Sequence, residues 1–192
     1  MSGFRLRRRS LGFTLVEVLT VSGLIAGLHG QGGYSYGVTQ ANEVKGIHNL
    51  TQVYTLLQAQ CITGTLPAAA FYPQGDPTKD AKSIIVLLKG AVPGIFVSPF
   101  APDGLKKKGL TFAWNDAVNG KDLDSLPRDT WLLIDLAAFI ADPKVPKPAR
   151  YLILYADGRA LAVEALPPDI VKAVEEARAK LDQSRPKQPK EK

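Results

Sequence analysis

Hydrophobic residues recur through residues 39–62 at steps of three and four, which is the spacing of one buried face of a helix. Thr39 or Asn42 can cap the start of this predicted helix, and Gly64 with Pro67 can end it. We interpret the stripe as a packing surface rather than a ligand site. Its members are Val44, Ile47, Leu50, Tyr54, Leu57 and Cys61.

An earlier apolar run extends from Phe13 to Leu28 and is broken by the polar, glycine-rich residues 29–33. It predicts a membrane helix of about 24 Å, at about 1.5 Å per residue, which is shorter than the roughly 30 Å hydrocarbon core of a bilayer. The run contains one acidic residue, Glu17. A carboxylate in such a segment is costly, so it usually has a partner and a purpose.

The rest of the chain predicts a small head of strands and helices. Aromatic and β-branched content favours strands, and Asp157-Gly158 between two apolar runs is typical of a hairpin turn. Residues 81–89 form an apolar run for which we favour a short helix over a buried strand, capped by Asp80 or Ser83 and stopped by Gly90. The expected strands are residues 110–114, 130–136, 151–155 and 160–164.

A final helix is predicted over residues 169–181. Its predicted inner face consists of Ile170, Val171, Val174 and Leu181. We therefore expect an α+β fold, in which a long N-terminal helix, half membrane and half amphipathic, packs on a small antiparallel sheet with a C-terminal helix. The expected organisation is a leader (1–12), a membrane helix (13–29), its continuation into the head (30–62), the head (63–166), a C-terminal helix (167–182) and a disordered tail (183–192).

The charge distribution argues against nucleic acid as a partner class. The chain carries +6, from 24 basic and 18 acidic residues, but four of the arginines (Arg5, Arg7, Arg8 and Arg9) lie in the leader. Without them the balance is 20 against 18, or +2. The triple lysine 106–108 is an isolated cluster, and we interpret it as a solvated loop.

The junction at Gly12-Phe13 has a distinctive chemistry. By the positive-inside rule, we expect the four arginines to hold residues 1–12 on the cytoplasmic side of a membrane. Gly12 has no side chain, so a protease can approach the backbone closely at that bond. Cleavage there leaves an amine on Phe13, and Glu17 follows one helical turn later, where its carboxylate can face that amine or the amine of a neighbouring chain.

This ordered set of arginines, Gly12, Phe13 and Glu17 resembles the N-terminal motif of type IV pilin-like proteins and type II secretion pseudopilins. The resemblance implies that a prepilin peptidase cuts after Gly12 and methylates Phe13, and that Glu17 guides assembly by neutralising a neighbour's amine. It further implies a non-enzymatic, single-pass subunit of the bacterial inner membrane with an extracytoplasmic head. The implied partners are the peptidase, other pilin-like subunits and secretion-machinery proteins, in a pseudopilus or pilus-like filament.

The head extends the resemblance. Phe96 to Pro99, the Ala-Trp-Asn strand end at 113–115 and the Asp157-Gly158 hairpin are similar to pilin-like families of planctomycete and verrucomicrobial bacteria that carry a His-x9-Asp-Gly motif. Two positions depart from that pattern. Ser98 stands where a cysteine is common in those families, and Lys147 stands in place of the histidine.

Residues suited to catalysis or metal binding are few. His29 and His48 are far apart in sequence, and we find no phosphate-binding glycine loop. We expect neither enzymatic activity nor a cofactor. Asp122 and Asp124, or Asp157, could contribute to a calcium site, but solvated loop acids are the preferred interpretation; Asp135, in an apolar strand, is expected to be buried and hydrogen-bonded.

Two alternatives to the pilin-like reading remain open. A conventional signal peptide, with small residues at Gly30-Gln31-Gly32, would export a secreted or surface-tethered binding module whose mature terminus lies near Gly33. A plain transmembrane anchor is the other. The single cysteine, Cys61, excludes an intrachain disulfide, and its place on the helical stripe favours a buried, inert thiol.

Overall fold

The computed structural model describes residues 31–62, 64–88, 90–140 and 147–184. The chain divides at residue 40 into two compact units, and residues 41–192 form the head described below. The predicted leader (1–12), the predicted membrane helix (13–29) and the last eight residues of the predicted tail lie outside the described residues. Within the described ranges, no helix is both long enough and apolar enough to cross a membrane.

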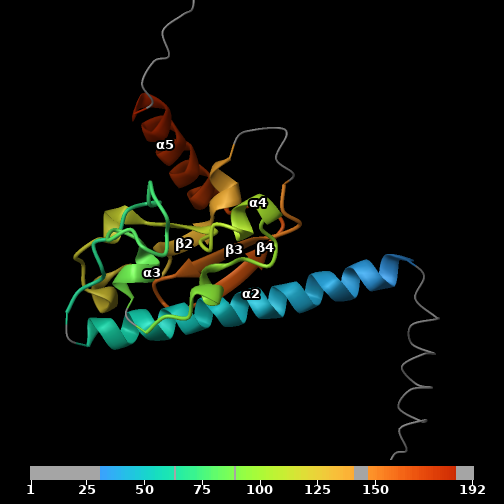
Figure 1. Ribbon diagram of the computed structural model, residues 1–192, viewed down its shortest axis with the longest axis horizontal. Helices are drawn as coiled ribbons and strands as arrows, with labels where there is room; N and C mark the ends of the chain where they lie inside the picture. The colour runs from blue at the N-terminus through green and yellow to red at the C-terminus, as the bar shows by residue number, and fades with distance from the viewer. Residues whose placement is uncertain (1–30, 63, 89, 141–146, 185–192) are drawn as a thin grey trace, which may run out of the picture. The chain divides into compact units, whose positions relative to one another are not determined.

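The head is an α+β fold built on a four-stranded antiparallel meander, as the sequence predicted. Its strand order is β1-β2-β3-β4, and sequence neighbours are also neighbours in the sheet (Figure 1). The strands are β1 (Phe112–Trp114), β2 (Trp131–Asp135), β3 (Tyr151–Tyr155) and β4 (Ala160–Val163). The helices are α2 (Gln31–Cys61), α3 (Ile84–Leu87), α4 (Asp103–Lys106) and α5 (Pro168–Ser184), with short 3-10 turns η1 (Pro93–Phe96), η2 (Asp116–Val118), η3 (Leu123–Ser125) and η4 (Leu136–Phe139).

Helix α2 covers one face of the sheet and forms the larger core with it. Because side chains alternate between the two faces of a strand, every second residue of β1 and β3 points toward α2. Leu50, Val53 and Leu57 of α2 are completely buried there. They belong to the same cluster as Phe112, Trp114, Leu133, Leu152 and Leu154 of the strands and Phe96 of η1.

Helix α5 packs on the opposite face of the sheet (Figure 1). Ile170 and Val174 are buried against a second cluster, in which Phe139 of η4 meets Phe71 edge to face at 4.8 Å. The prediction that Val171 belongs to the inner face of this helix was wrong, because its side chain is 38% exposed. A helix repeats every 3.6 residues, so a residue next to Ile170 turns about 100° away from the sheet.

The hairpin between β3 and β4 is the element that α2 touches most closely. Gly158 sits in its turn with φ +85°, a conformation that favours glycine, and the tyrosine ring of α2 lies directly against it. The Tyr54 hydroxyl donates a hydrogen bond of 3.0 Å to the Ala156 carbonyl in the same turn. One further contact forms near the start of the head, where Gly46 lies against the Leu152 side chain. The predicted Asp-Gly hairpin is confirmed, and it also positions α2.

Two predictions about the long helix were wrong. Thr39 and Asn42 do not cap its start, because both lie inside the continuous helix Gln31–Cys61. Val44 is 69% exposed and does not belong to the buried stripe, whereas Val53, which the stripe omitted, is fully buried. The helix is therefore rotated relative to the predicted stripe, so that Gly46 rather than Val44 faces the sheet.

Candidate functional site

The three residues on which the functional prediction rests, Gly12, Phe13 and Glu17, lie outside the described residues. The structure therefore neither brings them together nor separates them. The described part of the chain offers four features that bear on function: the outward face of α2, a groove beside it, a buried polar cluster around Asp135, and the surface charges.

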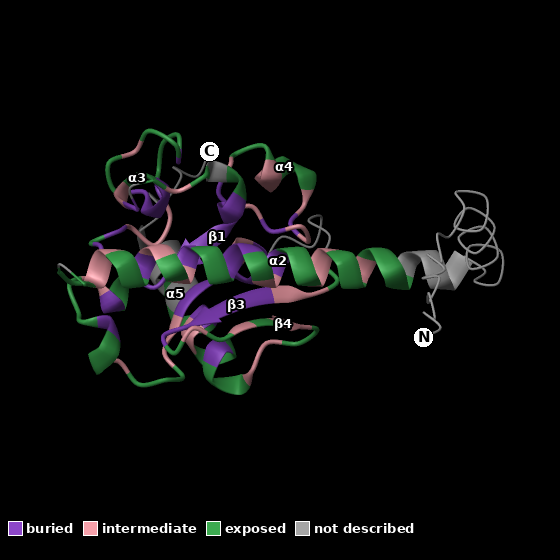
Figure 2. Ribbon diagram, turned by 90° about the horizontal axis from the view of Figure 1, so that it is seen from below, coloured by how far each residue is buried: buried purple, intermediate pink, exposed green. Residues whose placement is uncertain are grey.

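The outward face of α2 carries almost no charge. Helix α2 holds one acidic and one basic residue, Glu43 and Lys45, in its 31 residues. From Gly46 to Ile62 the exposed positions are His48, Thr51, Gln52, Thr55, Gln58, Ala59 and Ile62, and Figure 2 looks onto this face. Solvent-exposed helix faces usually carry acidic and basic residues, whereas the cores of protein interfaces are depleted of them.

Hydrogen bonds within the helix make this face less polar than its composition suggests. The Thr51 hydroxyl donates to the Ile47 carbonyl at 2.9 Å, and the Thr55 hydroxyl donates to the Thr51 carbonyl at 3.0 Å. The Gln52 amide and the His48 ring nitrogen lie 2.7 Å apart. Since these polar groups are engaged within the helix, another protein surface could cover them at a smaller desolvation cost.

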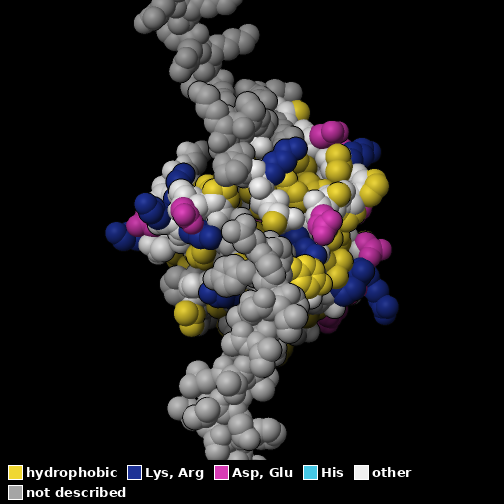
Figure 3. Space-filling view, turned by 90° about the vertical axis from the view of Figure 1, so that its right-hand side faces the viewer, with side chains coloured by type: hydrophobic (Ala, Val, Ile, Leu, Met, Phe, Trp, Pro, Cys, Tyr) yellow, Lys and Arg dark blue, Asp and Glu magenta, His cyan; other side chains and the backbone are white. Residues whose placement is uncertain are grey.

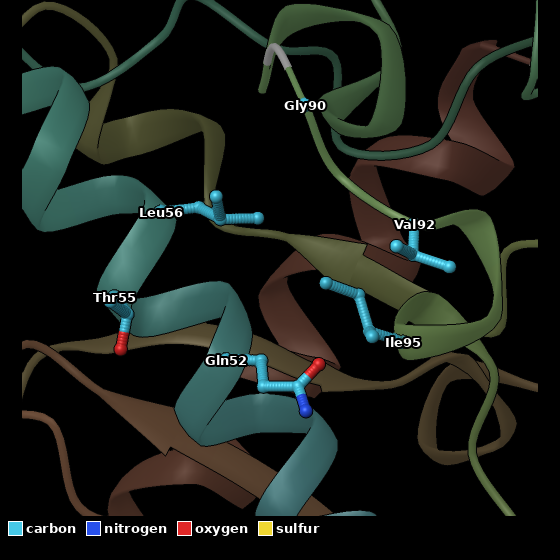
Figure 4. Close-up of a pocket in the computed structure, with 6 residues that line it drawn as sticks. All are labelled: Gln52, Thr55, Leu56, Gly90, Val92 and Ile95. Carbon is cyan, nitrogen blue, oxygen red and sulfur yellow. The ribbon is translucent and has the colours of Figure 1, made fainter.

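A shallow groove of about 290 Å³ runs between α2 and residues 90–95, which lead into η1. It is lined by Gln52, Thr55, Leu56, Gly90, Val92 and Ile95. Figure 4 shows Leu56 extending from the helix toward Val92 and Ile95. Val92 is 66% exposed, and the lining contains no ionisable side chain. The groove can accommodate an apolar side chain, but it has no group for acid–base or nucleophilic chemistry.

Two of the three acids named for calcium, Asp122 and Asp157, bond within their own loops. Asp122 accepts a hydrogen bond from the Asp124 backbone at the start of η3, and Asp157 pairs with Arg159 in the hairpin. The described residues contain no group of three or more His, Cys, Asp or Glu residues that could hold a metal ion. Cys61 is only half-buried, so the prediction of a buried thiol was wrong. Its partial burial still raises the pKa of the thiol.

Asp135 is buried and hydrogen-bonded, as the sequence predicted. It ends β2, is 1% exposed, and its Oδ2 accepts a hydrogen bond of 2.6 Å from the Leu152 backbone N–H. Its Oδ1 has no hydrogen-bond partner among the described residues. Burial raises the pKa of Asp135 to about 7, against smaller lowering effects from the Leu152 N–H and the nearby Ser98 hydroxyl.

Two buried hydroxyl residues complete the cluster around Asp135. Ser98 and Thr111 are both fully buried, and the Thr111 hydroxyl oxygen accepts a hydrogen bond of 2.6 Å from the Ser98 N–H. No local sequence pattern predicts this pairing, because Ser98 lies in an irregular segment and Thr111 is the residue before β1. The resemblance named above was the one reason to single out Ser98, and Lys147, the other position that departs from that pattern, is exposed.

Surface charges of both signs are mixed on the head. Lys106 of the triple lysine pairs with Asp103 at 3.6 Å, and Lys79 pairs with Asp76 at the same distance. On the face in Figure 3, basic and acidic side chains lie side by side among hydrophobic ones. This arrangement is unlike the continuous basic surface typical of nucleic-acid-binding proteins.

Comparison with protein-family models, with curated proteins and with solved structures found no match for this chain.

Proposed function

We propose that this chain is a non-enzymatic, pilin-like structural subunit. A prepilin peptidase cleaves it after Gly12 and methylates Phe13, and its N-terminal helix assembles with other pilin-like subunits into a type II secretion-type pseudopilus or type IV pilus-like filament. The subunit is held in the bacterial inner membrane by one helix, its head is extracytoplasmic, and Glu17 guides assembly. Nucleic acid has no part in this function.

One combination of features carries the proposal. The Gly12-Phe13 junction, with its preceding arginines and Glu17, stands upstream of a long helix that packs on a four-stranded antiparallel head. A cleavable junction exposes an amine, and an acid one helical turn later can pair with the amine of a neighbouring chain. The almost uncharged outward face of α2 supports the proposal further, since it suits a helix that contacts other subunits.

Gly12→Val tests the processing step. A branched side chain at the scissile position should block close approach of the peptidase, so the chain should keep its leader. Mass spectrometry of the N-terminal peptide from bacteria that express a prepilin peptidase measures this directly. The wild-type chain should begin at a methylated Phe13, and Gly3→Val, which alters another leader glycine, should be processed like the wild type.

Two outcomes would contradict the proposal. The first is a chain that begins at Phe13 in Gly12→Val. The second is a wild-type terminus near Gly33, which would favour a binding module exported by a conventional signal peptide.

A further inference from the structure

Asp135 is enclosed in the core of the head, at a buried site that we call the corner. Its strand partner across the ladder is Phe112 of β1, which lies in the core on the α2 side of the sheet. Residues directly opposite one another in an antiparallel pair point to the same face, so the carboxyl also points to the α2 side. There it meets Ser98, and the Leu152 N–H donates to its Oδ2.

Among the residues that the structure describes, the walls of this corner supply no cation. No acidic or basic residue occurs in β1, in η4 or in residues 96–100. From β3, Tyr151 belongs to the cluster on the opposite face of the sheet, and the preceding Arg150 is paired with Glu43 of α2 and with Glu164. Helix α2 also carries Lys45 and His48, and both of these side chains are exposed.

One wall is held less firmly than the others. The β1, β2 and β3 walls are joined by antiparallel strand pairing, which is regular beside Asp135. Residues 97–100, in contrast, are irregular, and together with Phe96 they are attached to the sheet through Thr111. The Thr111 N–H and hydroxyl both donate to the Phe96 carbonyl, at 3.0 and 3.3 Å, and the Thr111 hydroxyl oxygen accepts from the Ser98 N–H at 2.6 Å. Helix α2 adds a long hydrogen bond of 3.5 Å from the Asn49 amide to the Val97 carbonyl. If the corner opens, residues 96–100 should therefore move away before the paired strands separate.

We propose that Asp135 is a pH-responsive latch in the head: its neutral carboxyl is compatible with the closed corner, whereas its ionised carboxylate drives residues 96–100 away from the sheet and admits water. A carboxylate buried without a cation is strongly disfavoured, and opening is the way for the chain to hydrate it. The latch is independent of the proposed filament function, because it rests on the head alone.

The latch connects to the groove beside α2. Residues 97–100 directly follow η1, and Ile95 of η1 lines that groove opposite Leu56 (Figure 4). A displacement of residues 96–100 therefore shifts one wall of the groove, while α2 keeps its attachment to the β3–β4 hairpin through Tyr54. In this way the ionisation of one buried group alters the surface next to the uncharged face of the helix.

Hydrogen–deuterium exchange of the full-length chain in detergent solution tests the latch. Exchange is followed by mass spectrometry from pH 5 to 8.5 and corrected for the pH dependence of intrinsic exchange. For peptides containing residues 96–100 and Leu152, the opening equilibrium should increase by about tenfold per pH unit up to about pH 7 and then level off.

Two matched variants make the test specific. Asp135→Asn keeps an oxygen acceptor for the Leu152 N–H but cannot ionise, so opening should no longer depend on pH. Asp116→Asn removes an exposed acid and should behave like the wild type. Opening that is independent of pH in the wild type, or an unchanged slope in Asp135→Asn, would overturn the proposal.

If Asp135→Asn does not fold, carboxyl carbon NMR of the wild-type chain decides. An aspartate resonance with a midpoint near pH 7 supports the latch, and titration of every aspartate below pH 5 overturns it.

Discussion

Gly158 meets two requirements at once, one of backbone and one of space. Its φ is +85°, and a Cβ at this position would lie 2.7 Å from Cε1 of Tyr54. The ring cannot simply move aside, because its hydroxyl donates to the Ala156 carbonyl in the same turn. The contact between α2 and the hairpin therefore depends on the absence of a side chain at residue 158.

Gly158→Ala should destabilise the head more than a positive φ alone explains. Gly120 provides the matched control, because its φ is +70° and a Cβ there would meet nothing within 4 Å. Gly120→Ala should cost about 1 kcal/mol for the backbone. Gly158→Ala should cost a further 1–3 kcal/mol or so, because it also overpacks the contact with Tyr54.

Urea unfolding of both variants measures this difference. Equal costs for the two substitutions would show that the Tyr54 ring yields freely and that the contact is not tight.

At the scale of elements, α2 is attached to the β3–β4 hairpin at several points along its length. Arg150, just before β3, pairs with Glu43 of the helix and with Glu164 after β4. The Arg150 and Glu43 side chains are only 24% and 27% exposed, whereas Glu164 is 79% exposed. Since water screens an exposed pair more effectively, the pair with Glu43 should contribute more than the pair with Glu164.

A double-mutant cycle with Arg150→Met and Glu43→Gln tests this order. The coupling free energy should be about 1 kcal/mol, and the cycle with Glu164→Gln should give about half of that or less. Chemical unfolding of the single and double variants supplies the four stabilities that each cycle needs. Equal couplings in the two cycles would contradict the ranking by exposure.

Most elements of the head could be predicted because their signals are local. The hairpin needs only Asp157-Gly158 between two apolar runs, and the strand at residues 151–155 was predicted to the residue. The short helix predicted within residues 81–89 is α3, Ile84–Leu87. The strand predicted at 110–114 begins later, at Phe112, because the N–H of Thr111 donates to Phe96 rather than to β2.

The orientation of α2 could not be predicted from hydrophobicity. Its contact face includes Glu43, which pairs with Arg150, and Gly46, which meets Leu152, and neither is a hydrophobic residue. A stripe drawn through apolar residues alone therefore included Val44 and omitted Val53.

The candidate sites also differ in whether the sequence alone could predict them. Asp135 stood out in the sequence because an acid inside an apolar strand is rare. The groove joins residues 52–56 to residues 90–95, and only the tertiary structure brings those segments together.

At the scale of the whole head, one sheet separates two hydrophobic clusters, with α2 on one side and α5 on the other. Asp135 sits where β2 passes into η4 and is buried among residues of the α2 side. Its ionisation therefore affects the stability of the entire head, because the strands that enclose it form the centre of the fold.

Global stability should fall as the pH rises from about 4 to about 7. The pKa of Asp135 is raised in the folded state from 3.8 to about 7, so in this window the folded chain keeps a proton that the unfolded chain releases. The stabilisation from this group is complete below the unfolded pKa and is lost by about pH 7. Its total is at most about 4 kcal/mol.

Thermal unfolding of the wild type and Asp135→Asn across this range isolates the effect. The variant should gain stability relative to the wild type as the pH rises, and the difference should be constant above about pH 7. A difference that does not change between pH 4 and 8 would show that folding does not raise the pKa of Asp135.

The scarcity of charge on the outward face of α2 has a consequence for how the chain responds to its surroundings. Ionic strength weakens attractions between charged groups, with a screening length of about 8 Å at physiological salt, but it has little effect on contacts between amides, methyl groups and aliphatic side chains. Residues 46–62 contain no lysine, arginine, aspartate or glutamate. A contact made through this face should therefore depend much less on electrostatic screening by salt than a contact made through ion pairs.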